Sequence, residues 1–251
     1  FFVSGGAALS RDLAEFFHAA GLPILEGYGL TETSPVISVN TFGHLKFGTV
    51  GRPIPGVEVT VSEDGELMVR GENVMQGYYK MPEATAETIR DGWFYTGDIG
   101  HVDEDGFLVI TDRKKELIVT ATGKNIAPQV VEERVQSSEY VNEAVLVGNK
   151  RKFVSVVIVP NFDKLEEFAG SKGLSWSSFE ELVDADEVNE LYEKEIESSC
   201  EKLASFEKPK KFILLPREFS LERGELTPSM KVKRRVVEDH LESEIDSLYT
   251  E

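Results

Sequence analysis

The stretch from Phe94 to Glu116, FYTGDIGHVDEDGFLVITDRKKE, predicts a strand, a tight turn, a second strand and a charged connector. The turn is Asp103-Glu-Asp-Gly106, and the apolar run Phe107-Leu-Val-Ile110 follows it directly. An acidic turn closed by glycine before such a run is typical of a β-hairpin. The hairpin would bring Asp98, before the turn, close to Arg113, after it.

Asp98 and Arg113 together form a candidate site for a sugar or a phosphate. A carboxylate accepts two hydrogen bonds from a sugar diol, as dinucleotide-binding folds do with ribose. A guanidinium beside it donates to the same sugar or to a phosphate. Each residue alone could be half of a surface ion pair, which is the commoner fate of such side chains. We expect a nucleotide pocket upstream of Arg113 and a separate small domain downstream.

Composition and net charge limit the classes of function that the chain can have. The chain has 251 residues, 41% of them hydrophobic, which is enough for one large or two smaller domains. A formal charge of −18 disfavours general binding to nucleic acid or to an anionic membrane surface. No apolar run approaches the roughly 20 residues that span a bilayer, and no signal peptide is visible. The single Cys200 and four scattered histidines indicate neither a disulfide nor a zinc site, and fit a reducing cytoplasm.

Two glycine-rich turns follow predicted strands near the start of the chain. Ser4-Gly-Gly-Ala7 follows Phe1–Val3, and Gly27-Tyr-Gly-Leu-Thr-Glu-Thr33 follows Pro23–Leu25, with a helix capped by Ser10 between them. Glycine lets the backbone approach a ligand, and hydroxyl groups donate to phosphate oxygens. The spacing matches neither the Walker loop nor the dinucleotide fingerprint, so these residues alone favour an ordinary strand-to-loop turn.

The other segments predict a scaffold hairpin and a compact α+β unit. Val57–Val61 and Glu66–Arg70 alternate apolar and polar residues around Asp64-Gly65, which predicts a hairpin in a small, twisted β subdomain. After the connector, Pro128 suits the first turn of a helix. Further on we expect strands over 144–147, 153–159 and 212–215, an acidic helical stretch with one apolar face over 163–207, and a terminal helix.

Seven short motifs occur in order and carry a family resemblance. They are Ser4-Gly-Gly-Ala7, Gly27-Tyr-Gly-Leu-Thr-Glu32, Gly65-Glu-Leu with Arg70-Gly71, Tyr95-Thr-Gly-Asp98, Asp112-Arg-Lys-Lys115, Gly123-Lys-Asn125 and Leu226-Thr-Pro-Ser-Met-Lys231. The chain resembles the adenylate-forming (AMP-binding) superfamily of acyl-CoA synthetases, luciferases and peptide-synthetase adenylation domains. The sequence over residues 112–128 and 226–234 most resembles that of the long-chain fatty acid–CoA ligases.

The resemblance implies an α/β and α+β fold in two parts. Residues 1–111 would form the C-terminal part of the large AMP-binding domain, including the small β subdomain. Residues 112–116 would form a hinge, and residues 117–251 a mobile, compact α+β C-terminal domain that carries the catalytic lysine.

The resemblance also implies nucleotide-binding residues in the first part. The Ser4-Gly-Gly-Ala7 turn would line the adenine, Tyr28 would stack on the adenine face, and Asp98 and Arg113 would grip the ribose hydroxyls. A core tyrosine is the alternative for Tyr28. The implied residues are Gly5, Gly6, Ala7, Tyr28, Gly29, Asp98 and Arg113.

Three implied catalytic residues act on phosphate. Thr31 would hydrogen-bond the phosphate and Glu32 would hold Mg²⁺, a hard cation that prefers oxygen ligands. Lys231 would neutralise negative charge while the carboxylate of the substrate acid attacks the α-phosphate of ATP. The alternatives are a loop carboxylate in water for Glu32 and a solvated lysine for Lys231. The neighbouring Lys233 and Arg234 are expected to be solvated.

The implied reaction uses the hinge. A fatty acid and MgATP would give acyl-AMP and pyrophosphate, and coenzyme A would then take the acyl group and release AMP. Between the two steps the small domain would swing about Asp112 to Lys115. This swing would withdraw the catalytic lysine and bring in the loop of Gly123 and Lys124, which would line the pantetheine tunnel.

The chain begins at Phe1, in a strand-like segment, without the family's upstream phosphate loop and most of its fatty-acid tunnel. We therefore expect a C-terminal fragment of a long-chain ligase, inactive alone. The alternatives are another acyl- or aryl-CoA ligase of the superfamily and a non-catalytic interaction module that retains the fold. We expect a cytoplasmic location, while peripheral membrane association, oligomeric state and chain-length preference stay open.

Overall fold

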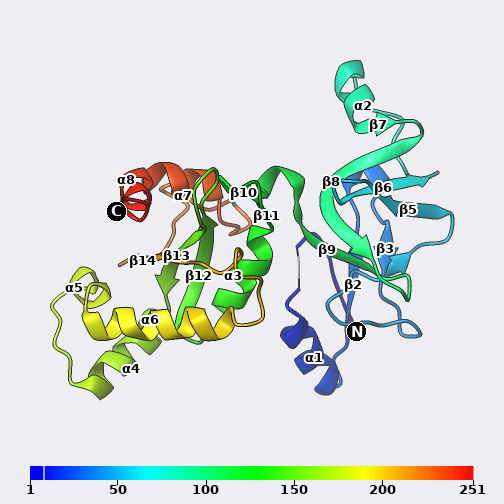
Figure 1. The fold of residues 1–251 in the computed structure, drawn as a ribbon. Helices are drawn as coiled ribbons and strands as arrows, with labels where there is room; N and C mark the ends of the chain where they lie inside the picture. Colours follow the sequence, from blue (N-terminus) through cyan, green and yellow to red (C-terminus); the bar gives the residue numbers. More distant parts are fainter. Residues whose placement is uncertain (8, 251) are drawn as a thin grey trace. The chain divides into compact units, whose positions relative to one another are not determined.

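The computed structural model describes residues 1–7 and 9–250 and divides into two compact units, Phe1–Lys115 and Glu116–Glu251. Each unit contains both helices and a sheet (Figure 1), so the mixed fold class expected from the sequence is confirmed.

The first sheet of the first unit carries the two glycine-rich turns. Strand β1 (Phe2–Ser4) runs parallel to β2 (Ile24–Tyr28), and α1 (Arg11–Ala19) connects them. The side chain of Ser10 accepts a hydrogen bond from Leu13 N at 3.3 Å, so the predicted helix cap is confirmed. The sheet continues antiparallel with β3 (Ser38–Val39) and β4 (Arg52–Pro53). Because β1 and β2 are parallel, both glycine-rich turns lie at the same edge of this sheet.

The second sheet of this unit holds both predicted hairpins, and both are confirmed. Its order is β5 (Val57–Val61), β6 (Glu66–Gly71), β8 (Trp93–Val102) and β7 (Ile89–Arg90), and β9 (Leu108–Arg113) also pairs with β8. The subdomain expected to be scaffold therefore shares its long strand β8 with the hairpin of Asp98. Buried Ile37, Val69 and Phe94 form one hydrophobic cluster of the first unit. The short helix α2 (Pro82–Thr88) was not expected from the sequence.

The second unit is built on a three-stranded sheet. Strands β12 (Val141–Val147) and β13 (Ser155–Pro160) are antiparallel, and β14 (Phe212–Leu214) adds in parallel to β13. A small hairpin, β10 (Ile118–Val119) with β11 (Asn125–Ile126), precedes α3 (Pro128–Gln136), which begins at the predicted proline.

Helices cover both faces of this sheet (Figure 1). On one face, Val156 and Ile158 of β13 pack with α3, α4 (Phe162–Lys172), α5 (Phe179–Val183) and α6 (Asp186–Ser199). On the other, Val157 and Val159 pack with α7 (Arg234–His240) and α8 (Glu242–Ser247). All six residues of β13 are buried, as two-sided cover requires.

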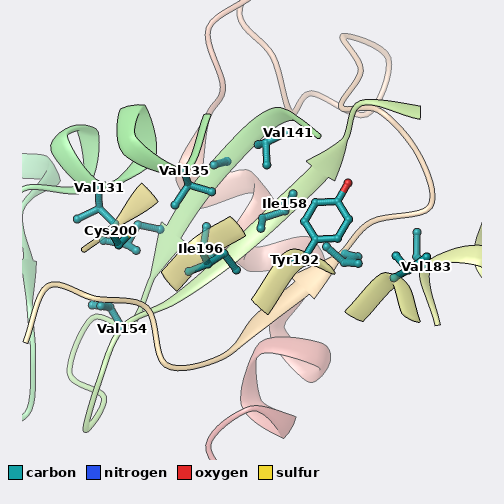
Figure 2. Close-up of a cluster of buried hydrophobic side chains, with 14 of the residues drawn as sticks. Val131, Val135, Val141, Val154, Ile158, Val183, Tyr192, Ile196 and Cys200 are labelled. Atoms are coloured by element: carbon teal, nitrogen blue, oxygen red, sulfur yellow. The ribbon is translucent and has the colours of Figure 1, made fainter. Parts of the chain in front are cut away.

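The acidic stretch over 163–207 has the predicted apolar face. Figure 2 shows Tyr192 and Ile196 of α6 in one buried cluster with Ile158 and Val135. The hydroxyl of Tyr192 donates to Tyr140 O at 2.7 Å, which satisfies the polar end of a fully buried ring. Cys200 follows the last turn of α6, and burial raises the pKa of its thiol, as for an inert structural cysteine.

Among the residues that the structure describes, no helix has the length and apolar content needed to cross a bilayer.

Candidate functional site

Asp98 and Arg113 lie opposite each other in the β8–β9 hairpin, as predicted. Asp103 shapes the turn, because its carboxylate accepts from Asp105 N at 3.0 Å and from Phe107 N at 2.8 Å. Arg113 Nε lies 3.0 Å from Asp98 Oδ1, and the side chains are 60% and 4% exposed respectively. A buried carboxylate is thus joined to a guanidinium that reaches the surface.

Tyr28 joins this pair from the first sheet. Its hydroxyl donates to Asp98 Oδ2 at 2.6 Å, so the two carboxylate oxygens have different partners. Burial, and then the charge of Asp98, raise the pKa of Tyr28 well above its ordinary value, so the phenol keeps its proton and donates. Both oxygens of the Asp98 carboxylate thus face donors, and acceptance on both oxygens is the chemistry that a sugar diol requires. The bond to Asp98 fits a ring held for stacking and a core tyrosine equally well.

The glycine-rich turns meet at the end of β2. Ser4 pairs with Glu26, so Gly5, Gly6 and Ala7 follow β1 beside the end of β2, and all three are exposed. At Gly29 a side chain cannot be accommodated, because a Cβ would lie 1.7 Å from Pro35 O. Ligands of open α/β sheets bind at the carboxyl ends of strands, and this edge carries Tyr28.

Thr31 and Glu32 lie in the 3₁₀ turn η1 (Thr31–Thr33) directly after this edge. Thr31 is exposed, and half-buried Glu32 accepts a hydrogen bond from the Tyr78 hydroxyl at 2.9 Å. Burial, and then Glu32, raise the pKa of Tyr78, so it remains the donor. Tyr78 was not among the residues expected from the sequence, since a contact across 46 residues leaves no local spacing signal.

A dedicated metal cage is absent over residues 1–7 and 9–250, where no group of three or more His, Cys, Asp or Glu side chains could hold an ion. Mg²⁺ is usually held by one or two carboxylates together with substrate phosphates and water. Glu32 suits that arrangement, because its carboxylate has further lone pairs beyond the bond from Tyr78.

The connector is attached to the first unit by Lys114. Its Nζ lies 2.6 Å from Asp64 Oδ2 and 2.8 Å from the buried Glu66 Oε2. Asp112 is buried and its Oδ1 accepts from Arg113 N at 2.6 Å. Lys115 follows in η2 (Lys114–Glu116) as the last residue of the first unit.

Lys231 lies in the second unit on an exposed hairpin loop. Leu226 and Val232 form the bridge that closes the loop, and Thr227 N donates to Lys231 O at 2.8 Å. Lys231 N donates back to Thr227 Oγ1 at 2.9 Å, which fixes the backbone at the lysine.

Gly123 and Lys124 lie on a different hairpin of the second unit, between β10 and β11. Gly123 has φ +76°, and nothing lies within 4 Å of the position that a Cβ would occupy, so its backbone conformation, and not crowding, favours glycine. Lys124 Nζ lies 5.3 Å from the centroid of the Phe206 ring.

The expectation that Arg234 is solvated is wrong. Its side chain is 18% exposed and forms an ion pair with Glu132 of α3, and its Nη1 donates to Leu146 O at 2.9 Å. The pairing spans 102 residues, so a run of basic residues gave no indication of it. Lys233 is exposed, as expected.

Two family models match the chain. The model of AMP-binding enzymes matches residues 1–79, and the model of the AMP-binding enzyme C-terminal domain matches residues 115–251.

Curated relatives align with almost the whole of this chain, but the alignment covers less than half of each relative's own length. The long-chain-fatty-acid–CoA ligase FadD15 of Mycobacterium bovis is 44% identical over 249 residues, which is 98% of this chain and 41% of the relative. Long-chain-fatty-acid–CoA ligase 5 of Mus musculus is 35% identical over 263 residues, which is 98% of this chain and 38% of the relative. The chain therefore spans about two fifths of the length of these relatives.

Solved structures show the same fold. O-succinylbenzoate coenzyme A synthetase (MenE) of Bacillus subtilis in complex with AMP is 29% identical with a TM-score of 0.67, covering 93% of this chain and 44% of that one. The adenylation domain of a carboxylate reductase of Mycobacterium chelonae is 25% identical with a TM-score of 0.77, covering 99% of this chain and 38% of that one.

Proposed function

The chain belongs to the AMP-binding enzymes, and from this premise we propose that it is the C-terminal part of a long-chain fatty acid–CoA ligase. The long-chain ligases among its relatives support this substrate class. The single observation that carries the proposal is the bonded set of Tyr28, Asp98 and Arg113, which joins a buried carboxylate to a surface guanidinium.

In the proposed first step, Asp98 and Arg113 bind the ribose of ATP, and Tyr28 stacks on the adenine beside Gly5–Ala7. Thr31 donates to phosphate. Glu32 is the residue that would hold Mg²⁺, which when bound neutralises phosphate charge. Lys231 contacts the substrate carboxylate and the α-phosphate while acyl-AMP forms and pyrophosphate leaves.

In the proposed second step, coenzyme A attacks the acyl-AMP and AMP leaves. The C-terminal part turns about Asp112 to Lys115, and the loop of Gly123 and Lys124 lines the thiol path. Lys114 supports a pivot at Lys115, because its pairing with Asp64 and Glu66 fixes the connector as far as the residue directly before Lys115.

We propose that the 251-residue chain alone has little ligase activity. The relatives are more than twice as long, so the chain supplies only part of the pocket. Robust acyl-CoA formation by the isolated chain would contradict this part of the proposal.

The function is tested in the full-length enzyme that carries this sequence, by acid-dependent exchange of pyrophosphate into ATP. We expect long-chain fatty acids to support exchange better than medium-chain or aryl acids. A preference for aryl acids would instead indicate another ligase of the superfamily, and no exchange with any acid would indicate a non-catalytic module.

The catalytic role of Lys231 is tested by Lys231→Ala in the same assay. Removing one charge-stabilising donor typically lowers the rate about 100-fold or more, and we expect that loss here. Lys233→Ala is the matched control, because Lys233 is also exposed in the same basic run and we expect its rate to stay within about twofold of wild type. Equal rates for Lys231→Ala and wild type would remove Lys231 from the mechanism.

A further inference from the structure

Glu225 is a buried carboxylate at the base of the hairpin that carries Lys231. Its side chain is 1% exposed. Arg217 binds both oxygens, with Nη1 2.9 Å from Oε2 and Nη2 2.7 Å from Oε1, and Ser220 N donates to Oε2 at 3.1 Å. His240 Nδ1 lies 3.3 Å from Oε1. Burial alone would raise the pKa of Glu225, but the hydrogen bonds from Arg217, Ser220 and His240, together with the charge of Arg217, outweigh burial and lower the pKa, so the group is ionised at neutral pH.

The backbone of Glu225 closes the same hairpin. Its carbonyl accepts from Lys233 N at 2.7 Å, and its N–H donates to Ser220 O at 3.1 Å. The next residue, Leu226, is buried in the core against α7 and α8 and bridges to Val232. The position of Glu225 therefore sets where the loop tip with Lys231 emerges.

A second ion pair holds the other end of the hairpin. Arg234 binds Glu132 of α3 and Leu146 O of β12, and Glu132 also accepts from Leu146 N at 2.6 Å. The exposed tip is thus attached at both ends to the sheet and its helices.

Two ion pairs that are largely shielded from solvent flank this exposed loop: the side chains of Arg217 and Glu225 are 28% and 1% exposed, and those of Arg234 and Glu132 are 18% and 15% exposed. Stability alone is a weak explanation for such pairs. Buried pairs roughly break even against well-packed apolar side chains, because the cost of desolvation cancels the attraction. Their directional bonds do fix geometry, and a misplacement of about 1 Å of a catalytic group can lower a rate on the order of 100-fold.

We propose that Glu225 with Arg217, and Arg234 with Glu132, are positioning residues for Lys231. They hold the base of its hairpin so that the ammonium group is presented in one place. The inference rests on the proposed function, because it predicts an effect only on the step that uses Lys231.

The test separates the two half-reactions of the full-length enzyme. In Glu225→Gln we expect acyl-AMP formation to fall about tenfold or more, while conversion of supplied acyl-AMP and coenzyme A to thioester stays within about twofold. In a Lys231→Ala background Glu225→Gln should lower acyl-AMP formation by less than about twofold, because the group it positions is gone. Glu222→Gln is the matched control, since Glu222 is an exposed carboxylate of the same segment, and should match wild type.

The inference is overturned by unchanged acyl-AMP formation in Glu225→Gln, and by two further results. One is an equal fall of both half-reactions in Glu225→Gln, which is the signature of a merely structural role. The other is a full additional loss in the Lys231→Ala background.

If Glu225→Gln fails to fold, Arg234→Lys replaces it, because lysine keeps the charge but not the forked geometry, and the same outcomes apply. If Lys231→Ala itself leaves acyl-AMP formation unchanged, the proposed function fails; if only Glu225→Gln does, this inference fails alone.

Discussion

Asp98 occupies an inward-facing position of β8, where burial alternates along the strand with Phe94 and Thr96 on the same side. Its register opposite Arg113 could be predicted, because a hairpin with a clear turn determines which residues face each other. The hydrogen bond from Tyr28 to Asp98 could not be predicted, because this bond joins two sheets across 70 residues. The solvated state expected for Arg234 was wrong for the same reason, since its partner Glu132 lies in a distant helix.

The crowding at Gly29 leads to a prediction for a single residue. In Gly29→Ala the new Cβ would lie 1.7 Å from Pro35 O, so the backbone must shift. We expect a loss of about 1–3 kcal/mol of unfolding free energy, as for other overpacked sites, measured by urea denaturation of the 251-residue chain. Gly43→Ala is the control, because nothing lies within 4 Å of its Cβ position. Equal stability of the two variants would show that the turn after β2 yields without cost.

At the scale of elements, local signals predicted the ends and faces of helices and strands. The cap of α1, the start of α3, both hairpins and the apolar face of α6 are confirmed. Helix α2 was not predicted because it buries no residue and so shows no apolar stripe; its sequence signs are a proline and an acidic residue, Glu83, in the first turn.

The connector leads to a prediction about pH. Lys114 first, and Ser62 second, lower the pKa of Asp64 to about 2. Because this lies below the unfolded value of about 3.9, the contact contributes stability above that pH and loses it as the pH falls toward 2. Both side chains are largely exposed, so the contribution to stability is small.

The measurement is an NMR titration of the Asp64 carboxyl group. In Lys114→Met we expect its pKa to rise toward the ordinary value, because the largest cause of the shift is removed. Lys115→Met, the neighbouring lysine of the connector, should leave the pKa unchanged. An unchanged pKa in Lys114→Met would mean that Lys114 does not hold the connector in solution.

At the scale of the whole molecule, each unit has its own core, and the proposed residues are divided between the units. Tyr28, Asp98 and Arg113 lie in the first unit, whereas Lys231 and Gly123 lie in the second. The sequence could indicate this division through its short charged connector, but motif order carries no information on side-chain contacts within each unit.

The central claim is that Asp98 accepts the ribose hydroxyls of ATP. It is tested most directly by acid-dependent pyrophosphate exchange in the full-length enzyme, comparing ATP with 2′-deoxy-ATP and 3′-deoxy-ATP. Hydrogen bonds to a charged group contribute about 1.5–3 kcal/mol, so wild type should prefer ATP over at least one analogue by about tenfold or more in kcat/KM. In Asp98→Asn this preference should shrink to within about threefold. Full discrimination by Asp98→Asn would contradict the account.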